Sequence, residues 1–166
     1  GNDKDAAATL DLVEQALVHL RDGRPLRLMG FVEGAGKGMR LLQTLTAKPV
    51  LYVCNVSEEE AATGNAWTEK VAAMAAEQGA QTVVISAKIE EEVAQLTDEA
   101  EKAEFLDALG LQETGLAGVV GAGYELLDLI TFFTSGPKET RAWTISVGAK
   151  APQAAGAIHT DFEKGF

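Results

Sequence analysis

The chain has 166 residues, of which 46% are hydrophobic and 23% are charged, so its composition is that of a globular protein and excludes a disordered one. No apolar run approaches the roughly 18 to 20 residues of a membrane span, and residues 1–5 lack the basic and apolar regions of a signal peptide. Cys54 is the single cysteine, which excludes an internal disulfide and fits a reducing compartment. We therefore expect a cytoplasmic protein without membrane contact.

The net charge of −11 is concentrated in the middle of the chain. Residues 1–50 hold 7 basic and 6 acidic side chains, residues 51–130 hold 3 and 16, and residues 131–166 hold 4 and 3. Phosphate backbones repel such an acidic centre. Any contact with nucleic acid is therefore expected at the two ends.

Residues 6–20 are predicted to form a helix that Gly23 and Pro25 end. Its apolar residues recur at spacings of three, four and three, a narrow stripe typical of a coiled-coil seam that needs a partner. The alternative is an ordinary amphipathic helix on a globular core. The stripe consists of Leu10, Val13, Leu17 and Leu20.

Residues 28–38 are rich in glycine, and Gly36-Lys37 invites comparison with a phosphate-binding loop. That loop needs a glycine where Phe31 stands and a magnesium-binding hydroxyl where Gly38 stands. We therefore interpret the segment as a connector.

Two short apolar runs, residues 49–54 and 82–85, predict strands that are buried on both faces. A helix over residues 65–78 lies between them and is expected to end at Gly79. Strand, helix and strand with short links predict a βαβ unit with parallel strands. The expected inward face of the helix is Trp67, Val71, Met74 and Ala75.

Two more helices and a β-rich segment follow. The first helix is expected to be capped by Thr97 and ended by Gly110, with Phe105, Leu106 and Leu109 facing inward. The second covers residues 114–129. From residue 131 the period changes to two, which predicts a strand around Trp143 paired with residues 131–134 across a turn at 135–137. The expected inward residues of the second helix are Leu116, Val119, Val120, Leu127 and Ile130.

Polar residues follow both predicted parallel strands. Asn55, Val56 and Glu58 come at the end of the first strand, and Ser86-Ala87-Lys88 come at the end of the second. Ligands of open α/β sheets lie outside the carboxyl ends of the strands. Asn-x-x-acid with Ser-Ala-Lys resembles the pairing with which P-loop GTPases read a guanine base. The alternative is that Asn55 and Ser86 only terminate strands and cap helices.

Longer stretches of the chain resemble the YchF (Obg-like ATPase) family, closely over residues 41–166 and loosely over residues 3–27. They include residues 46–56 and 84–90 around the strand ends, and residues 122–127 with 133–139. The most specific are residues 141–145, 150–156 and 158–166, the last of which is similar to the opening of the family's TGS domain, a β-grasp module. Residues 28–40 depart from the family.

The resemblance implies an α/β fold composed of pieces of three parts. Residues 1–48 would belong to a helical coiled-coil arm and its connector, residues 49–130 to the C-terminal part of a P-loop nucleotide-binding domain, and residues 131–166 to a partial TGS domain. The phosphate loop and the magnesium ligands would lie upstream, so the chain would be a fragment without hydrolase activity of its own.

The function that the resemblance implies is that of a ribosome-associated hydrolase of ATP, with GTP possible, that uses magnesium in the full-length protein. Asn55, Val56, Glu58, Ser86, Ala87 and Lys88 would read the base, and Lys138, Arg141 and Lys150 would contact RNA or the ribosome. The alternatives are a GTP-dependent RNA-binding protein and a non-catalytic interaction module of helical arm and TGS domain.

Overall fold

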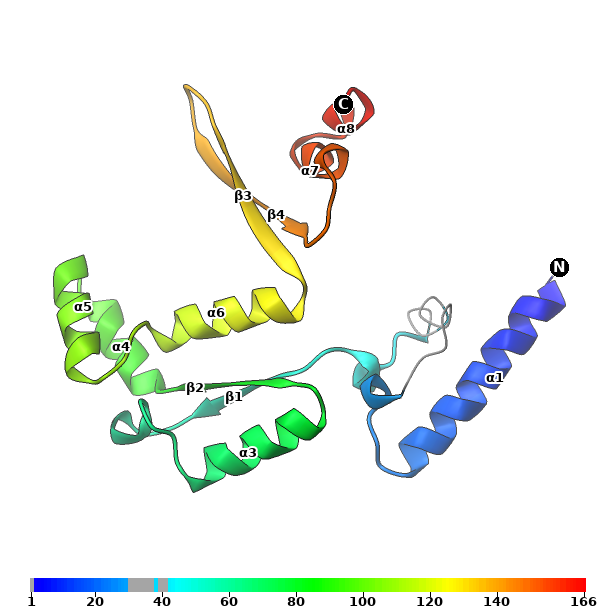
Figure 1. The fold of residues 1–166 in the computed structure, drawn as a ribbon, viewed down its shortest axis with the longest axis horizontal. Helices are drawn as coiled ribbons and strands as arrows, with labels where there is room; N and C mark the ends of the chain where they lie inside the picture. Colours follow the sequence, from blue (N-terminus) through cyan, green and yellow to red (C-terminus); the bar gives the residue numbers. More distant parts are fainter. Residues whose placement is uncertain (1, 30–37, 39–41) are drawn as a thin grey trace. The chain divides into compact units, whose positions relative to one another are not determined.

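The structure is a computed structural model that describes residues 2–29, 38 and 42–166 (Figure 1). Gly36-Lys37 and most of the predicted connector lie outside these residues. The chain divides into two compact units, Gly1–Val50 and Leu51–Phe166.

The first unit consists of α1 (Asn2–Arg21) and the short 3-10 helices η1 (Leu26–Leu28) and η2 (Leu45–Ala47). Gly23 has φ +73° and ends α1 as predicted. The buried side chains of the first unit are Leu12, Ala16 and Leu26, which form a small core. The stripe predicted from the spacing is not the face that packs here: Leu10, Leu17 and Leu20 are 59%, 42% and 39% exposed. Leu12 and Ala16, one helical turn apart, contact Leu26 instead.

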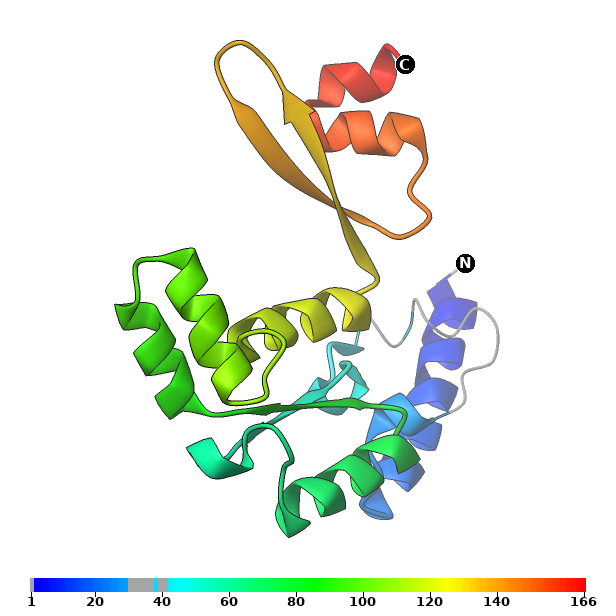
Figure 2. The same ribbon diagram turned by 60° about the vertical axis from the view of Figure 1, so that its left-hand side comes forward.

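The second unit begins with the predicted βαβ unit, β1 (Leu51–Asn55), α3 (Ala66–Glu77) and β2 (Gln81–Ile85). The two strands are parallel, as expected, with Leu51 opposite Gln81 and Asn55 opposite Ile85. The helix α3 lies on one face of the strand pair and α6 (Gly115–Leu126) lies on the other (Figures 1 and 2). The Asn65 side chain begins α3 by accepting N–H bonds from Trp67 and Thr68, and Gly79, at φ +60°, follows its end.

Two expectations for this unit are wrong. The strands contain no fully buried residue, and Val53 is 45% exposed, because the sheet has only two strands in the described part of the chain and each has an open edge. Trp67 does not face inward but is 72% exposed, with the Lys70 ammonium 4.5 Å from its ring centre. Thr68 and Ala75 are the buried residues of α3, so the helix contacts the sheet through small side chains.

After β2 come α4 (Ala87–Gln95) and α5 (Glu99–Ala108), at the carboxyl end of the strands (Figure 1). The helix α4 is not among the elements predicted above, and its Ile89 and Val93 form a second core with Leu106. Phe105 and Leu109 pack on that core as expected, and Gly110, at φ +73°, ends α5. The capping residue of α5 is Asp98 and not Thr97, since the Asp98 carboxylate accepts the first free N–H groups.

The predicted inward face of α6 is also wrong, since Leu116, Val120 and Leu127 are 64%, 51% and 57% exposed and Ile130, beyond its end, is 45% exposed. The face that meets the sheet contains glycines. A Cβ atom added to Gly115 would lie 2.7 Å from Ile85 Cγ2, and one added to Gly118 would lie 3.6 Å from Val83 Cγ1. Glycine allows the helix backbone to approach the strand closely, a role that hydrophobic periodicity does not detect.

The C-terminal segment is the predicted antiparallel hairpin, β3 (Leu129–Ser135) and β4 (Thr140–Ser146), followed by α7 (Ala151–Ile158) and α8 (Thr160–Lys164). Trp143 Nε1 donates to Thr134 Oγ1 across the hairpin at 2.9 Å. The Tyr124 and Thr144 hydroxyls, 3.0 Å apart, join α6 to β4. Among the helices that the structure describes, none is long and apolar enough to span a membrane.

Candidate nucleotide-base site

The two predicted polar segments meet at one end of the strand pair. Asn55 is the last residue of β1, and its sheet partner Ile85 directly precedes Ser86. The Val56 N–H donates to the Ile85 carbonyl at 2.9 Å, which extends the pairing by one residue. The parallel arrangement therefore brings Asn55, Val56 and Ser86 together at the carboxyl end of the strand pair, which is where ligands of open α/β sheets bind.

One hydrogen bond joins the two segments directly. Asn55 Oδ1 accepts the backbone N–H of Ala87 at 2.9 Å, across 32 residues of sequence. Because the oxygen of the carboxamide is held there, its NH₂ group is directed elsewhere, and the side chain is exposed. The Asn55 side chain therefore joins the two segments and leaves its NH₂ group exposed, which is more than the termination of a strand.

Ser86 stands at the N-cap position of α4 but makes no side-chain capping bond. It is only 3% exposed, and its Oγ has no hydrogen-bond partner among the described residues. A buried hydroxyl without a partner is uncommon in folded proteins. Capping therefore does not explain this serine.

Lys88 and Glu58 are the charged members of the site. Lys88 Nζ lies 3.3 Å from Glu92 Oε1 and 3.5 Å from Glu91 Oε2. The hydrogen bond to Glu92, followed by the charge of Glu91, raises the pKa of Lys88 above its ordinary value. Glu58 begins the 3-10 helix η3 (Glu58–Glu60) and is half-buried. Its neighbour Glu60 is engaged structurally, since Glu60 Oε2 accepts from Asn65 Nδ2 at 2.9 Å.

Sequence reasoning missed Glu90, which lies on α4 two residues after Lys88. Its carboxylate accepts the backbone N–H groups of Gly115 at 2.6 Å and Leu116 at 3.2 Å. It therefore caps α6 from another helix, where the positive end of the helix dipole favours a carboxylate. An acidic residue after Ser-Ala-Lys was the only signal in the sequence, and the partner, 25 residues away, could not be read from it.

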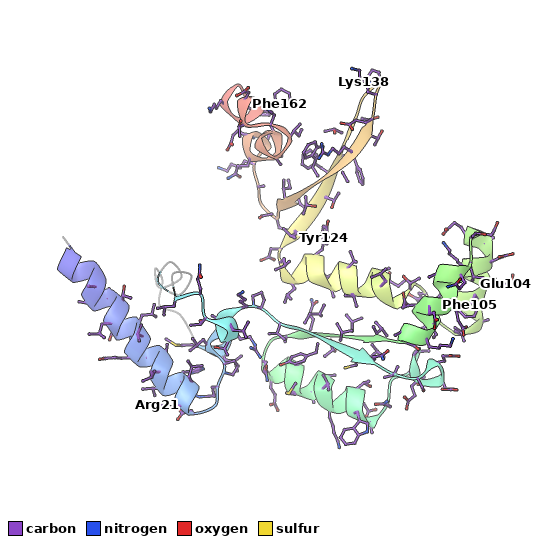
Figure 3. All side chains as sticks on the ribbon, turned by 180° about the vertical axis from the view of Figure 1, so that it is seen from behind. Arg21, Glu104, Phe105, Tyr124, Lys138 and Phe162 are labelled. Carbon is purple, nitrogen blue, oxygen red and sulfur yellow. The ribbon has the colours of Figure 1, made fainter. Side chains whose placement is uncertain are left out.

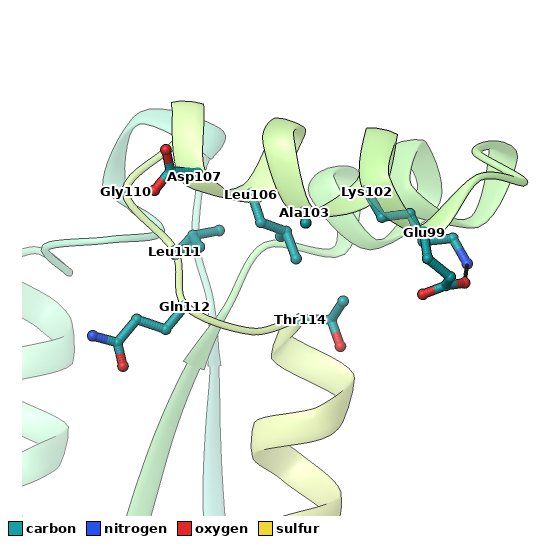
Figure 4. A pocket seen from close by; sticks show the side chains of 9 residues that line it. All are labelled: Glu99, Lys102, Ala103, Leu106, Asp107, Gly110, Leu111, Gln112 and Thr114. Carbon is teal, nitrogen blue, oxygen red and sulfur yellow. Dashed lines mark hydrogen bonds and ion pairs between the residues drawn. The ribbon is translucent and has the colours of Figure 1, made fainter.

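A separate shallow pocket lies between α5 and the segment that leads to α6 (Figure 4). It is lined by residues that include Lys102, which pairs with Glu99 at 2.7 Å, and Thr114. None of the six predicted base-site residues lines it. The described residues also contain no group of three or more His, Cys, Asp or Glu side chains that could hold a metal ion.

The predicted RNA-contacting cations lie on the C-terminal hairpin and just after it. Lys138 is at the hairpin tip (Figure 3). The Arg141 guanidinium lies 4.4 Å from the Trp143 ring centre, a cation–π contact. Lys150 immediately precedes α7, and its N–H donates to Gln153 Oε1 at 2.8 Å.

Comparison with known proteins places this arrangement among mixed α/β folds of the YchF type. The structure of the Schizosaccharomyces pombe YchF GTPase matches with a TM-score of 0.82 and 36% identity, and the match covers 98% of this chain and 43% of that one. The family YchF-GTPase_C, described as a protein of unknown function (DUF933), matches residues 129–166.

Curated relatives give the family more specifically. The chain is 48% identical to the ribosome-binding ATPase YchF of Escherichia coli O157:H7 over 166 residues, and 45% identical to that of Bacillus subtilis. The match covers 100% and 99% of this chain, and the chain spans 45% of the length of each relative. The resemblance to the YchF family is therefore confirmed, and it extends over the whole chain.

Proposed function

We propose that the chain supplies the base-reading part of the nucleotide site of a ribosome-associated hydrolase, with the phosphate-binding part in the portion of its relatives that this chain does not span. The observation that carries the proposal is the bond from the Ala87 N–H to Asn55 Oδ1, which builds one polar site from the ends of two parallel strands. In this proposal residues 49–130 belong to a P-loop domain, residues 131–166 to a TGS domain, and the protein is cytoplasmic.

The same bond favours adenine over guanine. Guanine carries a carbonyl oxygen at position 6 and needs a donor there, whereas adenine carries an amino group and needs an acceptor. The Ala87 N–H, a natural donor at this position, is already engaged by Asn55. The Val56 main-chain carbonyl supplies the acceptor for the adenine amino group, and the Asn55 NH₂ group lies beside it to donate to a ring nitrogen.

Two residues further reduce the preference for guanine. Guanine readers have a Lys directly after the Asn and an Asp three residues after it, and this chain has Val56 and Glu58. A glutamate is one methylene longer than an aspartate, so its carboxylate is displaced by about a bond length from the guanine edge. A site that fails to pair with a base edge loses most of its discrimination, because buried polar groups stay unmatched. We therefore propose ATP as the nucleotide, with GTP tolerated.

The variant Asn55→Asp tests this assignment in the full-length protein that we propose contains this chain. An aspartate oxygen still accepts the Ala87 N–H, but the donor to the base is replaced by an acceptor. ATP affinity should fall about tenfold or more, which corresponds to roughly 1.4 kcal/mol, the contribution of one hydrogen bond between neutral groups. Hydrogen exchange of the Ala87 amide should remain slow.

The matched control is Gln95→Glu, which adds the same charge on an exposed residue at the C-terminal end of α4, outside the six. It should leave ATP affinity within about twofold, since surface substitutions away from a site have small effects. Unchanged ATP affinity in Asn55→Asp would show that this asparagine does not contact the base.

We also propose that contact with the ribosome or its RNA uses the C-terminal cations. Curated relatives carry the name ribosome-binding ATPase. Lys138 and Arg141 lie on a hairpin outside the acidic middle segment, and Arg141 makes a cation–π contact with Trp143. Cations of this kind bind phosphate backbones.

A further inference from the structure

The first turn of α6 is held against the candidate base site from two directions. The Gly115 and Leu116 N–H groups donate to the two oxygens of Glu90, at 2.6 and 3.2 Å. The backbone at Gly115 also packs on Ile85, since an added Cβ would meet Ile85 Cγ2 at 2.7 Å and Glu90 Oε1 at 3.0 Å. Only a glycine fits between the strand end and the carboxylate.

Ile85 and Glu90 flank the segment that reads the base. Ile85 is opposite Asn55 in the sheet, and its carbonyl accepts the Val56 N–H. Glu90 is in the first turn of α4, whose first residue Ala87 donates to Asn55. The positions of Asn55, Val56 and Ala87 therefore depend on the end of β2 and the start of α4, and α6 contacts both of them.

We infer that Glu90 is a positioning residue for base recognition, which fixes the Ser86–Lys88 segment by joining α4 to the N-terminus of α6. This inference rests on the proposed function of the site. In the hydrogen-bond network, Glu90 bonds to the start of α6 and Asn55 bonds to Ala87. Glu90 therefore acts on the base site through Ala87 and Ile85. Without its carboxylate, two amide groups at the start of α6 lose their acceptors. The α4 start is then free to shift relative to Asn55.

The test compares Glu90→Ala, Glu90→Gln and the control Glu104→Ala in the full-length protein. Glu104 is an exposed glutamate of α5 outside the six predicted base-site residues (Figure 3). Glu90→Ala should weaken ATP binding about fivefold to tenfold. In hydrolysis assays KM should rise while kcat stays within about twofold, because uniform binding is lost and not transition-state stabilisation. Glu90→Gln keeps one acceptor oxygen and should fall between Glu90→Ala and the wild type.

Hydrogen exchange separates positioning from simple helix capping. A capping role alone accelerates exchange only at the Gly115 and Leu116 amides, whereas positioning also accelerates exchange at Ala87. If Glu90→Ala unfolds the protein, the comparison of Glu90→Gln with the wild type gives the same two readouts.

Two failures are distinguishable. If Asn55→Asp binds ATP as tightly as the wild type does, the proposed function itself is overturned. If Asn55→Asp loses ATP affinity but neither Glu90 variant does, and Ala87 exchange is unchanged in the Glu90 variants, the role of Glu90 alone is overturned.

Discussion

At the residue scale, the candidate site depends on how a few polar groups share their hydrogen bonds. The Asn55 oxygen accepts the Ala87 N–H, which leaves the NH₂ group of the side chain for the proposed base contact. Val56 uses its N–H on Ile85 and keeps its carbonyl. One bond to the Asn55 side chain and one backbone bond thus decide which donor and which acceptor remain, and in our proposal these match the edge of adenine better than the edge of guanine.

Replacing the two residues that depart from the guanine pattern should shift this preference. In Val56→Lys with Glu58→Asp, the carboxylate reaches the two edge N–H groups of guanine and the lysine stem packs along the base. We expect GTP affinity to rise about tenfold or more relative to ATP affinity, since a matched base edge discriminates strongly. Competition between labelled ATP and unlabelled GTP measures the ratio. An unchanged ratio would mean that these two positions do not read the base.

The meeting of the two polar segments was predictable because residue type and strand position both indicated it. Asn55 and Ser86 follow short apolar runs, and parallel strands place both ends at one edge. Glu90 was not predictable in the same way. Its partners Gly115 and Leu116 are specified by the packing of α6 on β2, which leaves no local pattern in the sequence.

At the element scale, the sequence predicted which segments are strands or helices better than it predicted how they face. Gly23, Gly79 and Gly110 mark helix ends through positive φ values, and these positions were correct. The predicted inward face of α3 was correct for Ala75, but large residues predicted to face inward, Trp67 of α3 and Leu116 of α6, are exposed for a shared reason. Both helices approach the two strands through small residues such as Ala75 and Gly115, so their large apolar side chains remain exposed.

The glycine contact of α6 gives a prediction on stability. Gly115→Ala places a Cβ atom 2.7 Å from Ile85 and should destabilise the chain by about 1–3 kcal/mol, the usual cost of overpacking. Gly118→Ala is the matched control, because its Cβ atom would meet Val83 at 3.6 Å, an ordinary contact. Alanine also has the better helix propensity by about 1 kcal/mol, so Gly118→Ala should be neutral or stabilising.

Urea unfolding followed by circular dichroism of the 166-residue chain compares the two variants. Equal midpoints for Gly115→Ala and Gly118→Ala would contradict the close approach of α6 to β2.

At the scale of the whole molecule, the charge distribution separates two roles. Residues 51–130, which contain the candidate base site, hold 3 basic and 16 acidic side chains, and residues 131–166 hold 4 basic and 3 acidic side chains. An acidic surface opposes contact with phosphate backbones, while the C-terminal hairpin does not. The proposed base site and the proposed ribosome contact therefore lie in different parts of the chain.

Reversing Lys138, Arg141 and Lys150 to Glu together in the full-length protein should weaken its co-sedimentation with 50S subunits or 70S ribosomes. The difference from wild type should shrink as salt rises, because screening already weakens these contacts. Reversing Lys70 and Lys102 of the acidic segment is the control and should change pelleting little. Unchanged pelleting of the triple variant at low salt would move the contact elsewhere.

The 166-residue chain by itself should show no ATPase activity. Phosphoryl transfer depends on groups that position the phosphates and the metal ion. Gly36-Lys37 lacks the spacing of a phosphate loop, and we propose that the phosphate-binding part lies in the portion of the relatives beyond this chain. Magnesium-dependent phosphate release that scales with protein and survives repurification would show this to be wrong.

Competitive binding of ATP and GTP to the full-length protein decides whether the strand ends form a base site suited to adenine. ATP should bind as tightly as GTP or more tightly, because the Ala87 N–H is engaged and the Val56 carbonyl is the available acceptor. GTP binding at least tenfold tighter than ATP, about 1.4 kcal/mol, would contradict it.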